Sequence, residues 1–240
     1  APAARRAAVA WHPHRDVLAT LSEGGAVAVH AMGGALAEAC TTYLHAGGGS
    51  LGEPLCLDWQ PNDLRGALAL GLSCGVTVWR CSPRGWAREW CLPGAAFACP
   101  ALAWSPSGRC LAAAGDRGVV RVWPHDGPGG SRHGGPQCVT LRRWRGVAAA
   151  DVRWAPDGAL LAVAHAGGRQ PFVRLWDTST WEVALHVSAG APGPAAGASG
   201  SEACAASLAW CGGKTLLGAG AGQLFELGGL AAPAGGWVAR

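Results

Sequence analysis

Short apolar runs alternate with polar turns along the chain, and one such pattern recurs about every fifty residues. An apolar run ends in tryptophan, a polar or glycine-containing turn follows, and a second apolar run comes after the turn. The five segments with this pattern are "VAWHPHRDVLAT" (9–20), "LDWQPNDLRGALAL" (57–70), "LAWSPSGRCLAAA" (102–114), "VRWAPDGALLAVA" (152–164) and "LAWCGGKTLLGAG" (208–220). Their tryptophans are Trp11, Trp59, Trp104, Trp154 and Trp210, and four of the turns contain a proline, at Pro13, Pro61, Pro106 and Pro156. Such an interval is typical of a repeat architecture.

A third apolar run follows in each repeat, and its side chains alternate. The runs are "GAVAVH", "GVTVW", "GVVRVW", "FVRLW" and "GQLFEL". In the first four, Val27/Val29, Val76/Val78, Val120/Val122 and Val173/Leu175 fall on one face, and Ala28, Thr77, Arg121 and Arg174 fall on the other. A period of two predicts β-strands with one strongly apolar face. The segment "GDRG" (115–118), which contains Asp116, predicts a hairpin turn.

Each repeat therefore contains three predicted strands and has room for a fourth. Units of 45 to 56 residues with this content are typical of β-propellers, whose four-stranded sheets, called blades, surround a central channel. The tryptophan–proline turns and the closing "RLWD" (174–177) resemble the WD40 family. The Trp-Asp dipeptide is Trp176-Asp177, while Trp79 and Trp123 keep only the tryptophan. We predict an all-β WD40 propeller in one domain, with five visible blades at 1–50, 51–97, 98–145, 146–187 and 204–240.

The repeat also explains a pair of histidines that could otherwise be taken for metal ligands. His12 and His14 flank Pro13, but the residues that correspond to His12 in the other repeats are Gln60, Ser105 and Ala155. These are not ligands of comparable strength. We interpret His12 as a surface turn residue and predict no metal site. We expect the five repeat tryptophans to be equivalent in space, each ending the inner strand of a blade, and mostly buried between blades.

A narrower resemblance is to the aladin family of WD-repeat nucleoporins. It rests on "VAWHPHRDVLATLSEGGAVAVH", on "SCGVTVWRCSP" and on "PFVRLWDTSTWEV", in which Trp181 follows Trp176 by five residues. The resemblance implies a non-enzymatic scaffold of the nuclear pore complex at the nuclear envelope. It implies a role in nucleocytoplasmic transport and binding to other nucleoporins, including one that spans the pore membrane. The alternative is an adaptor subunit of another multiprotein complex, for example a substrate receptor, and a third class is an enzyme on a propeller.

The same resemblance implies about seven blades, so the five visible units are expected to form an incomplete ring. The chain begins without methionine, and we expect it to be part of a longer protein whose upstream sequence completes the first blade. Unpaired strand edges and uncovered apolar faces favour self-association. The 240 residues alone should therefore aggregate, and a chain extended upstream should be monomeric.

Composition agrees with short strands and turns. Half of the residues are hydrophobic, 14% are charged, and the chain contains 38 glycines and 16 prolines. The net charge of +4 is too small to favour nucleic acid as a partner. We find no signal peptide, and no uninterrupted apolar run of about 18 residues that could span a membrane. Two Gly/Pro/Ser-rich segments, 124–137 and 188–203, are expected to be flexible loops.

The ten cysteines contain no C-x-x-C pair, and several lie in apolar strand-like runs. We expect reduced, partly buried thiols rather than a zinc or disulfide framework.

One basic segment stands apart from the repeat. "LRRWRG" (141–146) combines Arg142, Arg143 and Arg145 with Trp144, and either it is a partner surface or it is an outer strand with solvated arginines.

No motif in the chain indicates catalysis or a cofactor. "GGGSLG" and "GAGAG" lack the following helix that a phosphate-binding loop needs, and no G-x-S-x-G or H-E-x-x-H segment occurs. We predict no enzyme activity and no cofactor.

Overall fold

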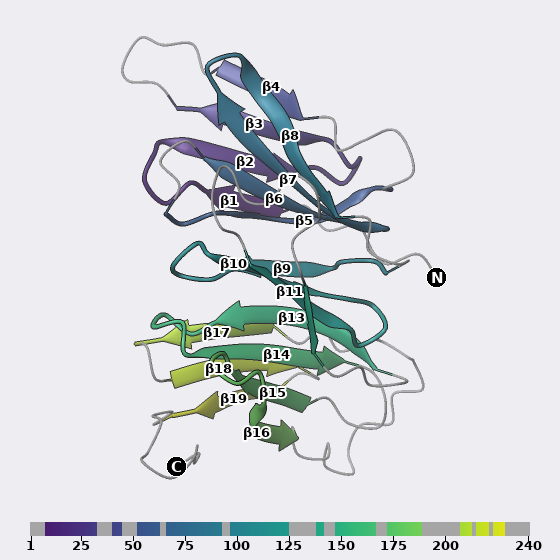
Figure 1. The fold of residues 1–240 in the computed structure, drawn as a ribbon, viewed down its shortest axis with the longest axis vertical. Coiled ribbons are helices and arrows are strands. Elements are labelled where there is room, and N and C mark those ends of the chain that lie inside the picture. The colour runs from purple at the N-terminus through teal and green to yellow at the C-terminus, as the bar shows by residue number, and fades with distance from the viewer. Residues whose placement is uncertain are drawn as a thin grey trace. The chain divides into compact units, whose positions relative to one another are not determined.

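The computed structural model describes eleven segments of the chain, and all of its regular elements are β-strands (Figure 1). The described segments are 8–32, 40–44, 52–62, 66–92, 97–124, 138–141, 147–166, 172–188, 207–212, 215–220 and 223–228. By contacts they divide into two compact units, one formed by residues 1–113 with 122–139 and one by residues 114–121 with 140–240. No helix long and apolar enough to cross a membrane occurs in these segments.

The first compact unit contains two complete four-stranded sheets. The first sheet consists of β1 (Ala8–Trp11), β2 (Val17–Leu21), β3 (Val27–Ala31) and β4 (Cys40–Leu44). The second consists of β5 (Pro54–Trp59), β6 (Ala67–Leu72), β7 (Gly75–Ser82) and β8 (Gly85–Leu92). In both sheets every strand pairs antiparallel with its neighbour in the sequence. Short turns between strands impose this order, because they can join only antiparallel neighbours.

The third sheet has the same strand order. It consists of β9 (Ala101–Trp104), β10 (Cys110–Ala114), β11 (Val120–Pro124) and β12 (Val139–Leu141). The predicted hairpin at 115–118 joins β10 to β11. Its turn is closed by hydrogen bonds from Gly118 N to Gly115 O (3.1 Å) and from Gly115 N to Val119 O (2.7 Å). Gly118 has a φ of 67°, which explains why a glycine follows Asp116 and Arg117 in this turn.

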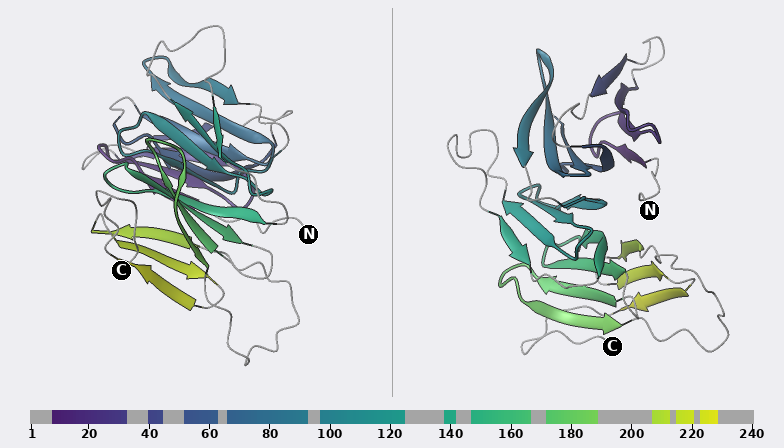
Figure 2. Two further views of the ribbon diagram at one scale, coloured as in Figure 1. Left: turned by 60° about the horizontal axis from the view of Figure 1, so that its bottom comes forward. Right: turned by 90° about the vertical axis from the view of Figure 1, so that its right-hand side faces the viewer.

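The second compact unit contains the remaining sheets (Figure 2). The fourth sheet consists of β13 (Ala148–Trp154), β14 (Leu160–Ala166), β15 (Phe172–Asp177) and β16 (Val183–Ser188). Among the described residues, the fifth sheet has three strands, β17 (Ser207–Cys211), β18 (Thr215–Gly220) and β19 (Gln223–Leu227). The all-β fold is therefore confirmed, with four sheets of four strands and one of three in the described chain.

Within each compact unit the sheets pack face to face, and the core lies between them. In the first unit one apolar cluster joins the first and second sheets, with Leu21, Val27 and Leu70 among its members, and another joins the second and third. In the second unit a cluster joins the fourth and fifth sheets.

The predicted apolar faces of the third strands are confirmed, since Val27, Val29, Val76, Val78, Val120, Val122, Val173 and Leu175 are all buried. The opposite faces are more enclosed than the alternation predicts. Ala28, Thr77 and Arg174 are buried as well. For Thr77 the reason is that the second sheet has an apolar cluster on each of its two sides.

Candidate functional site

The repeat tryptophans occupy equivalent places but differ in exposure. Trp11, Trp59, Trp104 and Trp154 each end the first strand of a sheet, and Trp210 is the penultimate residue of β17. Trp59, Trp104 and Trp154 are buried, as predicted. The prediction is wrong for Trp11, which is 59% exposed, and Trp210 is only half-buried. The described chain places no sheet against the face of β1 that carries Trp11, so burial depends on a neighbouring sheet and not on the repeat itself.

Indole groups link consecutive sheets. Nε1 of Trp59 donates a hydrogen bond to the carbonyl of Ala10, which directly precedes Trp11 in β1 (3.0 Å). Nε1 of Trp210 donates to the carbonyl of Arg153, which directly precedes Trp154 in β13 (3.4 Å). In both cases, an indole N–H on the first strand of one sheet donates to a backbone carbonyl on the first strand of the preceding sheet.

Two carboxylates make the reverse link. Oδ2 of Asp58 in β5 accepts a hydrogen bond from the backbone N–H of Trp104 in β9 (2.9 Å). Oδ2 of Asp151 in β13 accepts one from the backbone N–H of Leu208 in β17 (2.8 Å). Each acid holds the first strand of the following sheet. These charged groups have structural partners, which accounts for acids within otherwise apolar strands.

The interpretation of His12 is right about the turn and wrong about its exposure. His12 N donates to Val17 O (2.8 Å), and the same turn-closing bond joins Gln60 to Ala67, Ser105 to Cys110 and Ala155 to Leu160. Its ring is 5% exposed and packs edge-on against Trp59, with centroids 4.9 Å apart. Nδ1 of His12 accepts a hydrogen bond from the backbone N–H of His14 (3.1 Å). The position after the repeat tryptophan is thus a buried turn position.

The other residues that were predicted to be structural lie on the third strands of the sheets or in turns between strands. Trp123 and Trp176 are buried and lie one residue before the ends of β11 and β15, and Trp79 is half-buried in the middle of β7. Pro13, Pro61, Pro106, Pro156 and Asp116 lie in turns between strands. Asp177 ends β15, and its Oδ1 accepts hydrogen bonds from the backbone N–H (2.8 Å) and hydroxyl (2.5 Å) of Ser179. Arg142, Arg143, Trp144 and Arg145 lie outside the described residues, as does most of the two predicted loops.

Trp181 supports the fourth sheet from the turn after β15. Its φ of 58° is unusual for a large side chain, and its ring meets Trp154 edge-on, with centroids 6.1 Å apart. A hydrogen bond from Trp181 N to Asp177 O (2.8 Å) closes the turn. The second tryptophan of "LWDTSTW" therefore packs against a repeat tryptophan.

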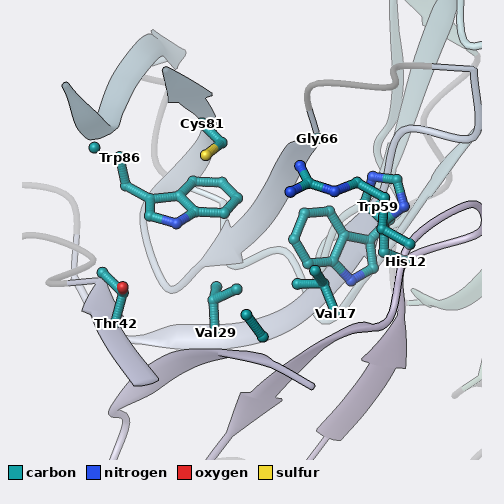
Figure 3. A pocket seen from close by; sticks show the side chains of 11 residues that line it. His12, Val17, Val29, Thr42, Trp59, Gly66, Cys81 and Trp86 are labelled. Atoms are coloured by element: carbon teal, nitrogen blue, oxygen red, sulfur yellow. The ribbon is translucent and has the colours of Figure 1, made fainter. Parts of the chain in front are cut away.

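A cavity of about 240 Å³ lies between the first and second sheets (Figure 3). Its lining comes from the β1–β2 turn, from β2, β3 and β4 of the first sheet, and from the second sheet. The lining residues are His12, Arg15, Val17, Val29, Ala31, Thr42, Trp59, Gly66, Cys81, Gly85 and Trp86. The rings of Trp59 and Trp86 stand 5.8 Å apart at 54°, with Val17 and Val29 on the opposite wall. The cavity is an aromatic and aliphatic recess with one charged lining residue, Arg15.

A second cluster of ionisable groups lies on the fourth sheet. His165 is 1% exposed and stacks on Phe172, with centroids 4.5 Å apart. The guanidinium of Arg174 lies 4.7 Å from the centre of the same ring, and its Nε donates to Nδ1 of His186 (3.1 Å). Burial, which is the largest cause, and the nearby Arg174 and His186 together lower the pKa of His165 to about 4. His165 is therefore neutral near pH 7.

The described residues include no group of three or more His, Cys, Asp or Glu side chains placed to hold a metal ion. Eight cysteines of the described residues are free thiols. Cys56 and Cys99 lie close together, since Sγ of Cys56 donates to the carbonyl of Cys99 (3.2 Å). The hydrogen bond between the two thiols, together with burial, raises the pKa of Cys99.

Comparison with known proteins addresses the fold. The family model "WD domain, G-beta repeat" matches residues 90–124, which contain the end of β8, the strand β9 and the β10–β11 hairpin. The sheets, the hairpin and the Trp-linked first strands extend the same design to the rest of the described chain. The described chain has the all-β fold of WD40-type propeller blades.

Two solved structures similar to these WD40 blades are chains of coat assemblies. A chain of "COPII on membranes, outer coat vertex" matches 92% of this chain at 15% identity, with a TM-score of 0.63. A chain of "The structure of the COPII coat assembled on membranes" matches the same share, with the same identity and TM-score. The matches span 57% and 32% of those two chains. No curated protein matches the sequence. At this identity the likeness concerns the fold.

The sequence did not identify two features of the WD40 blades. Asp58 and Asp151 could have been found as acids that interrupt apolar strands one and three residues before the repeat tryptophan. The cavity had no comparable signal, because its walls come from separate repeats, with Trp86 lying on the fourth strand β8.

Proposed function

We propose that the chain is a protein-interaction scaffold of the nuclear pore complex, of the aladin type, which supports nucleocytoplasmic transport at the nuclear envelope. The observation that supports a scaffold is the network between consecutive WD40 blades. Asp58 and Asp151 each bind the backbone of the next sheet, and Trp59 and Trp210 bind the backbone of the previous one. These groups therefore fix the relative positions of neighbouring sheets, which suits a protein that presents rigid surfaces to partners.

The nuclear pore is proposed from the sequence. "VAWHPHRDVLATLSEGGAVAVH" and the Trp176–Trp181 spacing resemble the aladin family more closely than WD40 proteins in general. Through that resemblance the proposed partners are other nucleoporins, including one that spans the pore membrane. Nucleic acid is not among the proposed partners, and the chain is proposed to reach the membrane through that nucleoporin. No enzyme activity is proposed.

Localisation of the full-length protein tests this function. A fluorescently tagged full-length protein, expressed at its natural level, should give a punctate signal at the nuclear rim that coincides with a marker nucleoporin. Affinity isolation from the same cells should recover nucleoporins. A diffuse or vesicle-associated cytoplasmic signal would contradict the pore proposal and favour an adaptor of another multiprotein complex.

A further inference from the structure

The cavity between the first and second sheets has the properties of a peptide-binding site. We propose that it takes one aromatic side chain of an acidic peptide segment in a partner protein, with Arg15 pairing to a carboxylate beside that side chain. The proposal rests on the scaffold function proposed above, and it does not depend on the location of that scaffold at the nuclear pore.

The aromatic walls are held in place before any ligand arrives. Trp59 is 4% exposed, donates its indole N–H to Ala10 and packs edge-on against His12. Trp86 stands beside it and belongs to β8, which pairs with β7 along its length. A binding site that needs little reordering loses little conformational entropy when a ligand binds.

Glycines close the floor of the cavity and open its rim. A Cβ atom at Gly66 would lie 3.4 Å from both His12 and Trp59, so the glycine lets these rings pack against the backbone. A Cβ atom at Gly85 would meet nothing within 4 Å, so this part of the lining faces open space. The cavity is therefore accessible from the side of the β7–β8 turn.

The volume suits one side chain. An apolar cavity of about 150 Å³ is enough for benzene, whereas sites for whole small molecules usually measure about 300–1,000 Å³. At about 240 Å³, this cavity fits a single phenyl-sized group. Its lining is mainly aromatic and aliphatic, which favours an apolar anchor.

The positive charge of Arg15 favours a peptide with an acidic residue next to the bound aromatic side chain. Arg15 is exposed, makes no ion pair with a described residue, and no Asp or Glu lines the cavity. Asp16 is outside the lining, and Glu89 on β8 pairs with Arg80 at 2.8 Å. Aromatic walls alone would also attract a cation, but Arg15 repels one. The combination therefore favours a carboxylate next to the bound ring.

The probe is a fluorescein-labelled peptide, Gly-Ser-Phe-Glu-Asp-Ser-Gly, amidated at its C-terminus, titrated with the full-length protein by fluorescence polarisation. We expect saturable binding in the range of about 10–100 µM, where a small single-anchor site falls. A peptide with serine in place of phenylalanine should not bind at 1 mM protein. A peptide with Gln and Asn in place of the acids should bind about five-fold or more weakly, as expected for loss of one charged contact.

Arg15→Gln should weaken binding of the acidic peptide by about five-fold or more and leave the weaker binding of the Gln/Asn peptide unchanged. Arg109→Gln is the matched control, because Arg109 is an exposed arginine in a turn of another repeat. Equal affinity of the two variants for the acidic peptide would overturn the proposal, and so would tighter binding of a lysine-containing peptide.

A second measurement places the peptide in the cavity. Cys81 lines the cavity and is half-buried, whereas Cys91 on the same strand pair is exposed and outside the lining. Bound peptide should slow alkylation of Cys81 by iodoacetamide, measured by mass spectrometry, and leave Cys91 unaffected. Protection of neither thiol under saturating peptide would contradict the site. Neither result depends on where the protein resides in the cell, so a failed localisation test would leave them standing.

Discussion

At the scale of single residues, the neighbourhood decides the role of a repeat position. Trp104 and Trp11 end equivalent strands, yet Trp104 is 5% exposed and Trp11 is 59% exposed. Asp58 and Asp157 are both acids of the repeat, yet Asp58 joins two sheets and Asp157 bonds only to Ala159 N within an exposed turn. Such pairs allow each role to be measured against a matched control.

Replacing Trp104 with alanine should lower the free energy of unfolding by about 3–5 kcal/mol, because a large buried side chain leaves a cavity. Trp11→Ala should cost less than about 1 kcal/mol, because its side chain is exposed. Urea denaturation monitored by circular dichroism measures both. A cost below about 1 kcal/mol for Trp104→Ala would mean that the repeat has been misassigned.

Asp58→Ala should cost about 1–3 kcal/mol, because the backbone N–H of Trp104 loses its acceptor in a partly buried place. Asp157→Ala should cost less than about 1 kcal/mol, since water can replace the acceptor in an exposed turn. Thermal denaturation of the two variants under identical conditions compares them. Similar losses would show that the link between sheets contributes little.

His165 should make stability depend on pH. Its pKa is about 4 in the folded protein and 6.5 unperturbed, so between these values the unfolded chain binds more protons. The free energy of unfolding should therefore fall as pH is lowered from 6.5 to 4, by up to about 3 kcal/mol from this group. His186, whose pKa is also lowered by burial and by Arg174, adds to the same trend. In His165→Leu the fall should be visibly shallower when urea midpoints are measured across this pH range, and an unchanged slope would contradict this account.

At the scale of elements, strands were predictable where the pattern is local. The alternation of Val76 and Val78 placed β7, and "GDRG" placed the β10–β11 hairpin, because both depend on neighbouring residues. The burial of His12 was not predictable, because its ring packs against Trp59 of the next sheet. The cavity beside Trp86 was missed for the same reason: its walls are brought together only when two sheets pack.

Strands pack closely around Gly71 in β6. A Cβ atom there would lie 2.5 Å from Sγ of Cys56 and 2.6 Å from the carbonyl oxygen of Cys99. Gly71→Ala should therefore destabilise the protein by about 1–3 kcal/mol through overpacking. Gly24→Ala is the control, because the nearest atom to its Cβ would be Ser22 Oγ at 3.7 Å. Chemical denaturation should separate the two variants, and equal stabilities would contradict the tight contact.

At the scale of the whole molecule, the chain combines five sheets in two compact units, and its cysteines are dispersed among strands and turns. We predict ten free thiols by titration of the denatured protein with a chromogenic disulfide, and no stoichiometric zinc by metal analysis. Fewer than ten thiols, or one equivalent of zinc, would contradict the interpretation of the cysteines and of His12 with His14.

The bonds between first strands also set an order for folding during synthesis. The indole N–H of Trp59 is synthesised 49 residues after its acceptor, the carbonyl of Ala10. The carboxylate of Asp58 is synthesised 46 residues before its donor, the backbone N–H of Trp104. At about 5–20 residues per second, a ribosome takes about 2–10 s to supply each partner. Each of these sheets therefore emerges from the ribosome with a hydrogen-bond donor or acceptor whose partner lies on the next sheet. The sheets are then joined in the order in which they are translated.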